Sequence, residues 1–204
     1  MVELRLYVEG GGDSKLLRTA CRQGFCEFLQ RAGLKGHMPR VVACGSRRQA
    51  YDDFCTAQTQ KKSAAMLLVD SEDTVTVNSP WAHLLQRSGD QWPVPPGSAD
   101  DDCHLMVQCM ESWFLADRDA LSAFFGQGYN AGALPAAGNP IEAISRHSIY
   151  QALAAATNKC KTKSPYEKGE HSFKLLQRID PNEVAIGSPW AARFVSILKR
   201  KMGC

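Results

Sequence analysis

The 204-residue sequence lacks a long apolar run and lacks paired cysteines. No stretch approaches the roughly 20 consecutive apolar residues that span a membrane, and residues 1–8 are too short and too charged for a signal peptide. The eight cysteines include no C-x-x-C pair, the short spacing that zinc sites usually show. We therefore expect a cytoplasmic protein with free thiols, without a membrane association and without structural zinc.

Two nucleotide-binding patterns are also missing. The glycine turn at Gly10, Gly11 and Gly12 is followed by Asp13-Ser14-Lys15, which fits neither the G-x-x-x-x-G-K-[ST] phosphate loop nor G-x-G-x-x-G. The chain contains no internal repeats and no heptads. A solenoid and a coiled coil are thereby excluded.

The most informative stretch is residues 66–73, Met-Leu-Leu-Val-Asp-Ser-Glu-Asp. Its four apolar residues predict a buried parallel strand, and the acids Asp70, Glu72 and Asp73 follow at the carboxyl end, where open α/β sheets bind ligands. Clustered carboxylates repel one another unless a proton or a cation relieves them. Hard oxygen donors suit Mg²⁺ or Mn²⁺. Either Glu72 or Asp73 could be the partner of Asp70, because strand alternation decides nothing past the strand end.

Strands and helices alternate in the first half of the chain. Residues 2–8, 39–44 and 66–69 read as strands, with helices predicted over 15–29 and 47–57. This order predicts a parallel sheet with right-handed crossovers, joined by a fourth strand over residues 103–110. We expect an α/β fold with a mostly parallel sheet flanked by helices in residues 1–118. A helical extension in residues 119–204, with helices near 120–125, 141–156, 175–181 and 189–200, would pack on it.

Two further acids follow apolar runs. Glu9 ends the first predicted strand and Glu111 follows the fourth. Taken alone, Glu9 could also be a capping carboxylate, and Trp113 beside Glu111 is better explained by packing than by base stacking. If Glu9, Asp70, Glu72 and Glu111 converge, they could hold one or two magnesium ions that activate water, while a nearby lysine steadies the developing charge.

Positive charge gathers at the carboxyl terminus. Residues 159–204 contain ten Lys and Arg against four Asp and Glu, so this segment carries +6 and the rest of the chain −3. A basic segment beside an acidic metal site suits a polyanion, although a solvated helix surface explains the charge equally well. The candidate contacts to nucleic acid are Lys159, Lys161, Lys163, Lys168 and His171. For Arg47 and Arg48, exposure at a helix start is favoured over phosphate contact.

Several of these motifs together resemble a known family. Val8-Glu9-Gly10 at one strand end and Val69-Asp70-Ser71-Glu72-Asp73 at another resemble the Toprim domain. The glycine-rich turn, Glu111-Ser-Trp and the Tyr-x-Lys-Gly segment at 166–169 resemble a small bacterial Toprim-related family of formally unknown function. Its members often accompany an ABC-type or overcoming-lysogenisation-like (OLD-type) ATPase in phage defence.

The resemblance implies that Glu9 is a general base or metal ligand, that Asp70 and Glu72 are metal ligands, and that Lys168 joins them in catalysis. Asp73 and Glu111 complete the expected ligand set. The expected function is a Mg²⁺- or Mn²⁺-dependent nuclease acting on DNA or RNA as the effector of an ATPase subunit. A non-catalytic Toprim-shaped scaffold and phosphoryl transfer to a nucleotide are the alternatives. The chain is too small for a topoisomerase or a primase.

Overall fold

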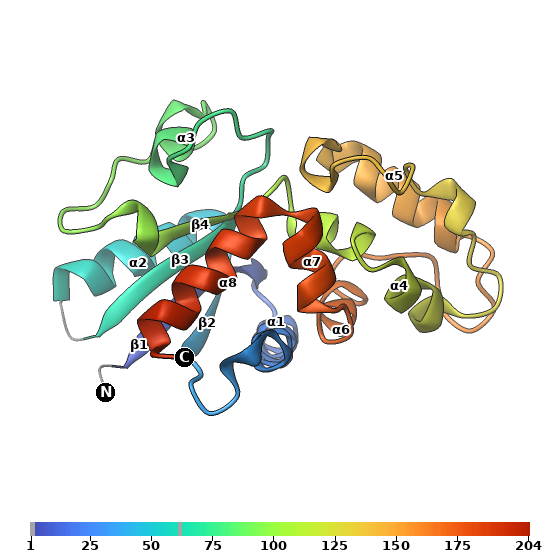
Figure 1. Ribbon diagram of the computed structural model, residues 1–204, viewed down its shortest axis with the longest axis horizontal. Helices are drawn as coiled ribbons and strands as arrows, with labels where there is room; N and C mark the ends of the chain where they lie inside the picture. Colours follow the sequence, from blue (N-terminus) through green and yellow to red (C-terminus); the bar gives the residue numbers. More distant parts are fainter. Residues whose placement is uncertain (1–2, 61–62) are drawn as a thin grey trace.

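A computed structural model describes residues 3–60 and 63–204, in which one four-stranded sheet has the order β2-β1-β3-β4. The strands are β1 (Leu4–Gly11), β2 (Arg40–Gly45), β3 (Ala64–Asp70) and β4 (Cys103–Met106). All three neighbouring pairs are parallel, so the carboxyl ends of the strands meet at one edge (Figure 1). The predicted α/β class with a parallel sheet flanked by helices is confirmed.

Both faces of the sheet are buried, as the uninterrupted apolar runs require. Because side chains alternate along a strand, Met66 and Leu68 of β3 pack into one hydrophobic cluster, while Leu67 and Val69 pack into the other. The residue just beyond, Asp70, is also buried. A buried carboxylate therefore ends a strand that is otherwise apolar.

Helices cover each face. The helices α1 (Lys15–Leu29) and α8 (Pro189–Met202) contribute Phe25, Phe28 and Phe194 to the first cluster. On the opposite face, α2 (Arg47–Gln60) and α3 (Pro80–Gln86) contribute Phe54 and Trp81 to the second. Figure 1 shows α8 in front of the sheet and α2 behind it. None of the helices in the described residues has the length and apolar character needed to cross a membrane.

The carboxyl-terminal residues form the predicted helical extension. Its helices are α4 (Arg118–Phe125), α5 (Arg146–Thr157), α6 (Ser172–Leu176) and α7 (Pro181–Gly187), followed by α8. The helices α4 to α7 lie beyond the carboxyl edge of the sheet, and α8 returns across it (Figure 1). Short helical turns complete the chain at η1 (Gln30–Leu34), η2 (Asp100–Asp102), η3 (Met110–Leu115), η4 (Ala131–Ala133) and η5 (Ile141–Ala143).

Three elements differ from the sequence-based expectation. The helix expected over residues 175–181 is instead the turn between α6, which ends at Leu176, and α7, which begins at Pro181. The fourth strand ends at Met106 instead of residue 110. The chain after it leaves the sheet, and the backbone N–H of Met110 donates to the side chain of Asp70. The helix expected over residues 141–156 is split, because Ser145 caps α5 through the N–H of Ser148 and starts a new helix at Arg146. The first strand begins at Leu4 among the described residues, and the predicted start at Val2 lies outside them.

Candidate metal centre

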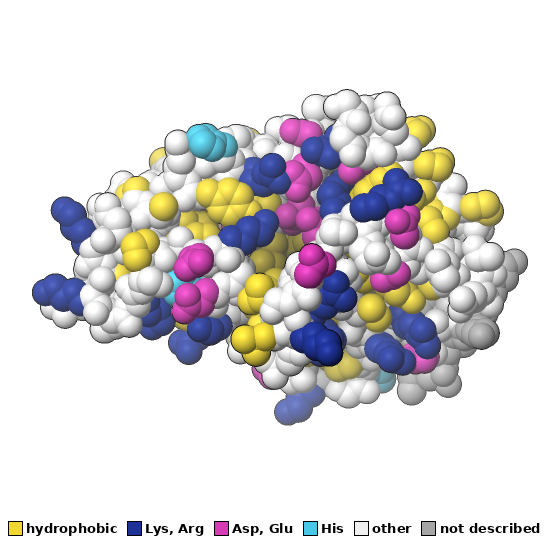
Figure 2. Space-filling view, turned by 180° about the vertical axis from the view of Figure 1, so that it is seen from behind, with side chains coloured by type: hydrophobic (Ala, Val, Ile, Leu, Met, Phe, Trp, Pro, Cys, Tyr) yellow, Lys and Arg dark blue, Asp and Glu magenta, His cyan; other side chains and the backbone are white. Residues whose placement is uncertain are grey.

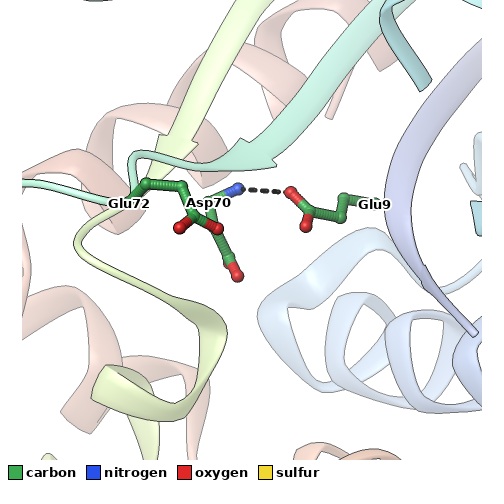
Figure 3. Close-up of side chains that lie close together, drawn as sticks. All are labelled: Glu9, Asp70 and Glu72. Atoms are coloured by element: carbon green, nitrogen blue, oxygen red, sulfur yellow. Dashed lines mark hydrogen bonds between the residues drawn. The ribbon is translucent and has the colours of Figure 1, made fainter. Parts of the chain in front are cut away.

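Three carboxylates converge at the carboxyl edge of the sheet. Glu9 lies near the end of β1, Asp70 is the last residue of β3, and Glu72 follows two residues later. Each offers one oxygen, and these three oxygens lie within 4.8 Å of one another (Figure 3). This trio contains three of the four acids whose convergence the sequence analysis considers. It also separates Glu72 from Asp73, which is not part of the group.

Asp70 is the most constrained of the three. It is 4% exposed, its Oδ1 accepts a hydrogen bond of 2.8 Å from the N–H of Met110, and its own N–H donates to Glu9 Oε2 at 3.2 Å. Burial raises the pKa of Asp70 well above its ordinary value, and the charges of Glu9 and Glu111 raise it further. Burial likewise raises the pKa of Glu9, against the opposing charge of Arg47. A divalent cation would relieve this repulsion, so the donor set fits a hard metal ion.

Glu72 reaches the group through an uncommon backbone conformation. Its φ is +66°, and its N–H donates to the carbonyl of Gln108 at 2.8 Å. A left-handed conformation is uncommon for a non-glycine residue and is usually imposed by surrounding contacts. The turn directs Asp73 away: its side chain is 66% exposed and pairs with Arg87 at 2.8 Å. The structure therefore does not place Asp73, a predicted metal ligand, with the other acids.

Glu111 lies nearby but is otherwise engaged. It is fully buried, Tyr150 Oη donates to its Oε2 at 3.0 Å, and Tyr166 Oη and Ser172 Oγ donate to its Oε1 at 3.0 and 3.2 Å. Its oxygens do not join the group of Glu9, Asp70 and Glu72. Glu111 is therefore a hydrogen-bond acceptor for hydroxyls of the helical extension, and the structure does not bring this predicted ligand into the group around Asp70.

Lys168 lies beside these acids, as the sequence predicts for a catalytic lysine. Its Nζ donates to Tyr150 Oη at 2.9 Å and lies 5.4 Å from the centre of the Tyr150 ring. Burial opposes its charge, but the acids Glu111, Asp70 and Glu9 outweigh that effect and raise the pKa of Lys168. The amine is therefore a cation at neutral pH, suited to neutralising negative charge instead of carrying a proton to it.

A cavity of about 240 Å³ joins these groups. Glu9, Asp70, Glu111 and Lys168 line it together with the glycine turn and apolar side chains, Leu17, Met106, Met110 and Phe173. Figure 2 shows acidic side chains in a hollow of the rear face with basic side chains on both sides. Glu9 and Asp70 at the sheet edge thus line this cavity, whereas Glu72 is not among its lining residues.

Glycine is required where the turn closes on α1. At Gly11, with a φ of +87°, an added Cβ would lie 2.7 Å from the backbone of Arg18. At Gly45, with a φ of +86°, it would lie 2.5 Å from the carbonyl oxygen of Gly12, which also accepts from Arg18 Nε at 2.8 Å. The glycine-rich sequence therefore reflects close packing of three chain segments at the rim of the cavity.

Arg47 is a site residue for which the sequence favours exposure at a helix start. Its side chain is only 13% exposed, so the favoured prediction of exposure is wrong, whereas Arg48 is exposed at 68%. Arg47 lies 3.6 Å from Glu9, donates to the backbone carbonyl of Asp70, and is held by Asp90 through bonds of 2.9 and 2.6 Å. Asp90 lies in a loop of turn-forming residues, and no local pattern signals this pair.

The predicted nucleic-acid contacts lie in different environments. Lys159 and Lys161 are exposed, and Lys163 is half-buried with its amine 4.7 Å above the ring of Phe124. His171 is buried against Phe124 and Phe125, and its Nδ1 accepts from the N–H of Glu167 at 3.1 Å. A buried ring cannot reach a phosphate, so the prediction for His171 is wrong.

Part of the basic charge is neutralised within the fold. Arg193, Arg200 and Lys201 of α8 pair with the acid triplet at 100–102. Trp113 is fully buried and stacks on Phe28 with ring centres 5.2 Å apart, as the packing interpretation expects. Lys159 and Lys161 are exposed and can therefore meet a polyanion.

Comparisons with known proteins give one result. No curated protein and no solved structure matches the chain. The match is to a family described as "Domain of unknown function (DUF4276)", and it extends over residues 8–199. This range includes all three converging carboxylates, Glu111 and Lys168. The chain belongs to the DUF4276 family.

Proposed function

We propose that the protein is a divalent-metal-dependent nuclease. The observation that carries the proposal is the convergence of Glu9, Asp70 and Glu72 within 4.8 Å at the carboxyl edge of a parallel sheet, beside a charged lysine. Ligands bind at this edge of open α/β sheets. Acids brought together against their mutual repulsion are typical of a site that binds a cation or performs chemistry.

Glu9, Asp70 and Glu72 would hold Mg²⁺ or Mn²⁺, which would supply a water of lowered pKa and neutralise charge on a phosphodiester. The chain's own residues prepare the rest of the site. Arg47 holds the carboxylate of Glu9 from one side. In its alternative role as a general base, Glu9 would be better matched to accepting a proton near neutral pH than an exposed carboxylate, because burial raises its pKa.

Lys168 supplies a fixed positive charge. Its raised pKa keeps the amine protonated, and Tyr150 positions it through a hydrogen bond. Tyr150 is itself bound to the buried carboxylate of Glu111. A cation held in this way stabilises the negative charge that develops on phosphate oxygens, a term that commonly dominates such catalysis.

The partners follow from the surface and from the resemblance. Lys159, Lys161 and Lys163 would contact the nucleic-acid backbone, which can be DNA or RNA. The resemblance to Toprim-related defence proteins supports a role as the effector subunit of an ABC- or OLD-type ATPase in a cytoplasmic anti-phage system. The alternative, a non-catalytic scaffold, needs the same surface but not the carboxylates.

The decisive experiment incubates the protein, alone and with any ABC- or OLD-type ATPase that a neighbouring gene encodes, with DNA, RNA and tRNA in Mg²⁺, Mn²⁺ or EDTA. Cleavage is expected in Mg²⁺ or Mn²⁺ and not in EDTA. Glu9→Gln and Asp70→Asn are expected to lower it by on the order of a hundredfold or more, because each removes a ligand charge. Glu3→Gln, an exposed acid near the opposite edge of the sheet, is the matched control. If wild type and both site variants behave alike on every substrate, the nuclease proposal fails, and retained binding without cleavage favours the scaffold.

A further inference from the structure

A guanidinium from the helical extension reaches into the acid group. Arg146, the first residue of α5, donates from its Nη1 to Glu72 Oε2. Glu72 is one of the three carboxylates that would hold the metal ion. The contact joins the two predicted parts of the chain, 74 residues apart in sequence. A cation of the protein itself therefore already interacts with this carboxylate.

Gln108 holds both members of the pair in place. Its backbone carbonyl accepts from the N–H of Glu72 at 2.8 Å, and its side-chain Oε1 accepts from the N–H of Arg146 at 3.2 Å. Its Nε2 donates to Thr74 Oγ1 at 3.0 Å, which fixes the orientation of the amide. Gln108 is buried, so the backbones of Glu72 and Arg146 are locked together while the guanidinium depends on the ion pair.

Arg146 differs from the other arginine near Glu72. Arg87 lies 4.0 Å from Glu72, but Asp73 and Asp90 hold its guanidinium at 2.8 and 3.2 Å. Among the described residues, Glu72 is the one carboxylate within ion-pair distance of Arg146. The side chain of Arg146 is 42% exposed, whereas that of Arg87 is 21% exposed. Arg146 is therefore the cation that can leave.

We propose that Arg146 competes with the divalent ion for Glu72, and that binding of the ion releases Arg146 to contact a phosphate of the nucleic acid. The inference rests on the proposed metal centre. A doubly charged ion at the three carboxylates repels the guanidinium and takes over its partner. The freed side chain extends from the start of α5 into solvent beside the acids, where a phosphodiester supplies the next anion, and arginine binds phosphate well because of its planar donors.

The first test measures Mn²⁺ binding by titration calorimetry without nucleic acid. Arg146→Gln is expected to bind Mn²⁺ tighter, by on the order of fivefold, the strength of a partly exposed ion pair. Arg146→Lys keeps the charge without the planar fork and gives a smaller gain in the same direction. The matched control is Arg48→Gln, which removes an exposed pair with Asp52 on α2 and leaves the affinity unchanged. Thermal denaturation verifies that each variant is folded.

The second test measures binding of a single-stranded oligonucleotide by fluorescence anisotropy in Ca²⁺, which takes the same oxygen ligands, and in EDTA. Wild type is expected to bind the oligonucleotide more tightly in Ca²⁺ than in EDTA, and Arg146→Gln is expected to show little of this gain. The slope of log affinity against log salt concentration in Ca²⁺ should be smaller for Arg146→Gln by about 0.7, the value of one phosphate contact on a single strand. Equal Mn²⁺ affinity in folded wild type and Arg146→Gln overturns the competition. Absence of Mn²⁺ binding in both proteins instead overturns the metal centre, so the two failures are distinct.

Discussion

Asp70→Asn is expected to stabilise the metal-free protein while removing its ability to bind metal. Asparagine keeps the acceptor for the N–H of Met110, which Asp70 uses at 2.8 Å, but removes a buried charge that burial, Glu9 and Glu111 all disfavour. Functional sites that hold like charges together without their ligand commonly lower the stability of a protein, so substitutions there often raise stability and abolish function.

The structure bounds the size of the effect. The pKa of Asp70 is raised from an ordinary value of 3.8, so the folded state binds its proton more tightly than the unfolded state does. The associated stability is present below 3.8 and is lost as pH rises toward the folded pKa. Because the folded protein can always keep the proton on Asp70, the free energy of unfolding falls by at most about 1.36 kcal/mol for each pH unit above 3.8. At pH 7 the loss therefore cannot exceed about 4 kcal/mol. We expect Asp70→Asn to recover about 1–3 kcal/mol of this.

The assay is urea and thermal unfolding in EDTA across the pH range. Each kcal/mol corresponds to about 2–4 °C in Tm for a chain of this length. The gap between Asp70→Asn and wild type should be widest at about pH 8 and nearly closed at about pH 4. Saturating Mn²⁺ should then raise the Tm of wild type and not that of the variant.

Asp90→Asn is the matched control, with the opposite sign. The side chain of Asp90 is 2% exposed and pairs with Arg47 at 2.6 Å and Arg87 at 3.2 Å, and although burial opposes its charge these arginines lower its pKa. Its loss leaves Arg47 without its main partner, and we expect a destabilisation of about 3 kcal/mol. If Asp70→Asn is less stable than wild type at high pH in EDTA, the carboxylate of Asp70 is supported by its surroundings, and the reasoning about the acid group is refuted.

Two further predictions concern regions outside the acid group. Burial, helped by the charge of Arg193, lowers the pKa of His104 to about 3, so the folded protein keeps this ring neutral and loses stability as pH falls below 6.5. In urea unfolding between about pH 7.5 and 5.5, wild type should lose about 1.4 kcal/mol more stability than His104→Gln. Parallel curves of stability against pH would contradict the assignment. Lys161→Glu combined with Lys163→Glu should weaken oligonucleotide binding and flatten its salt dependence in anisotropy titrations, because two phosphate contacts are lost; unchanged binding would mean that these lysines are only a solvated surface.

Local patterns were enough to predict the sheet and the position of its acids. The run Met66–Val69 is apolar without interruption, which is typical of a strand buried on both faces, and the acid that follows necessarily lies at the strand end. The parallel order then brings Glu9 and Asp70 to the same edge. The trio could therefore be predicted, apart from the choice between Glu72 and Asp73.

That choice depended on contacts distant in sequence. The carbonyl of Gln108 accepts from the N–H of Glu72, where φ is +66°, and no feature of the segment Asp-Ser-Glu-Asp encodes this bond. The burial of Arg47 depends on Asp90, 43 residues later in a segment rich in turn formers. The position of Glu111 after an apolar run predicts a ligand, but its hydroxyl partners, Tyr150, Tyr166 and Ser172, all come from the extension, and no local pattern signals them.

The acids and the cations of the site are held in different ways. Asp70 accepts from a backbone N–H, Glu9 accepts from the N–H of Asp70, and Glu72 is fixed through its own backbone. Lys168 and Arg146 instead approach on long side chains from the extension. Rigid carboxylates suit an ion that demands fixed oxygen geometry, whereas long side chains can follow a polymer backbone as it moves. In the proposed nuclease, the helical extension would be the part of the chain that adapts the rigid edge of the sheet to a phosphate substrate.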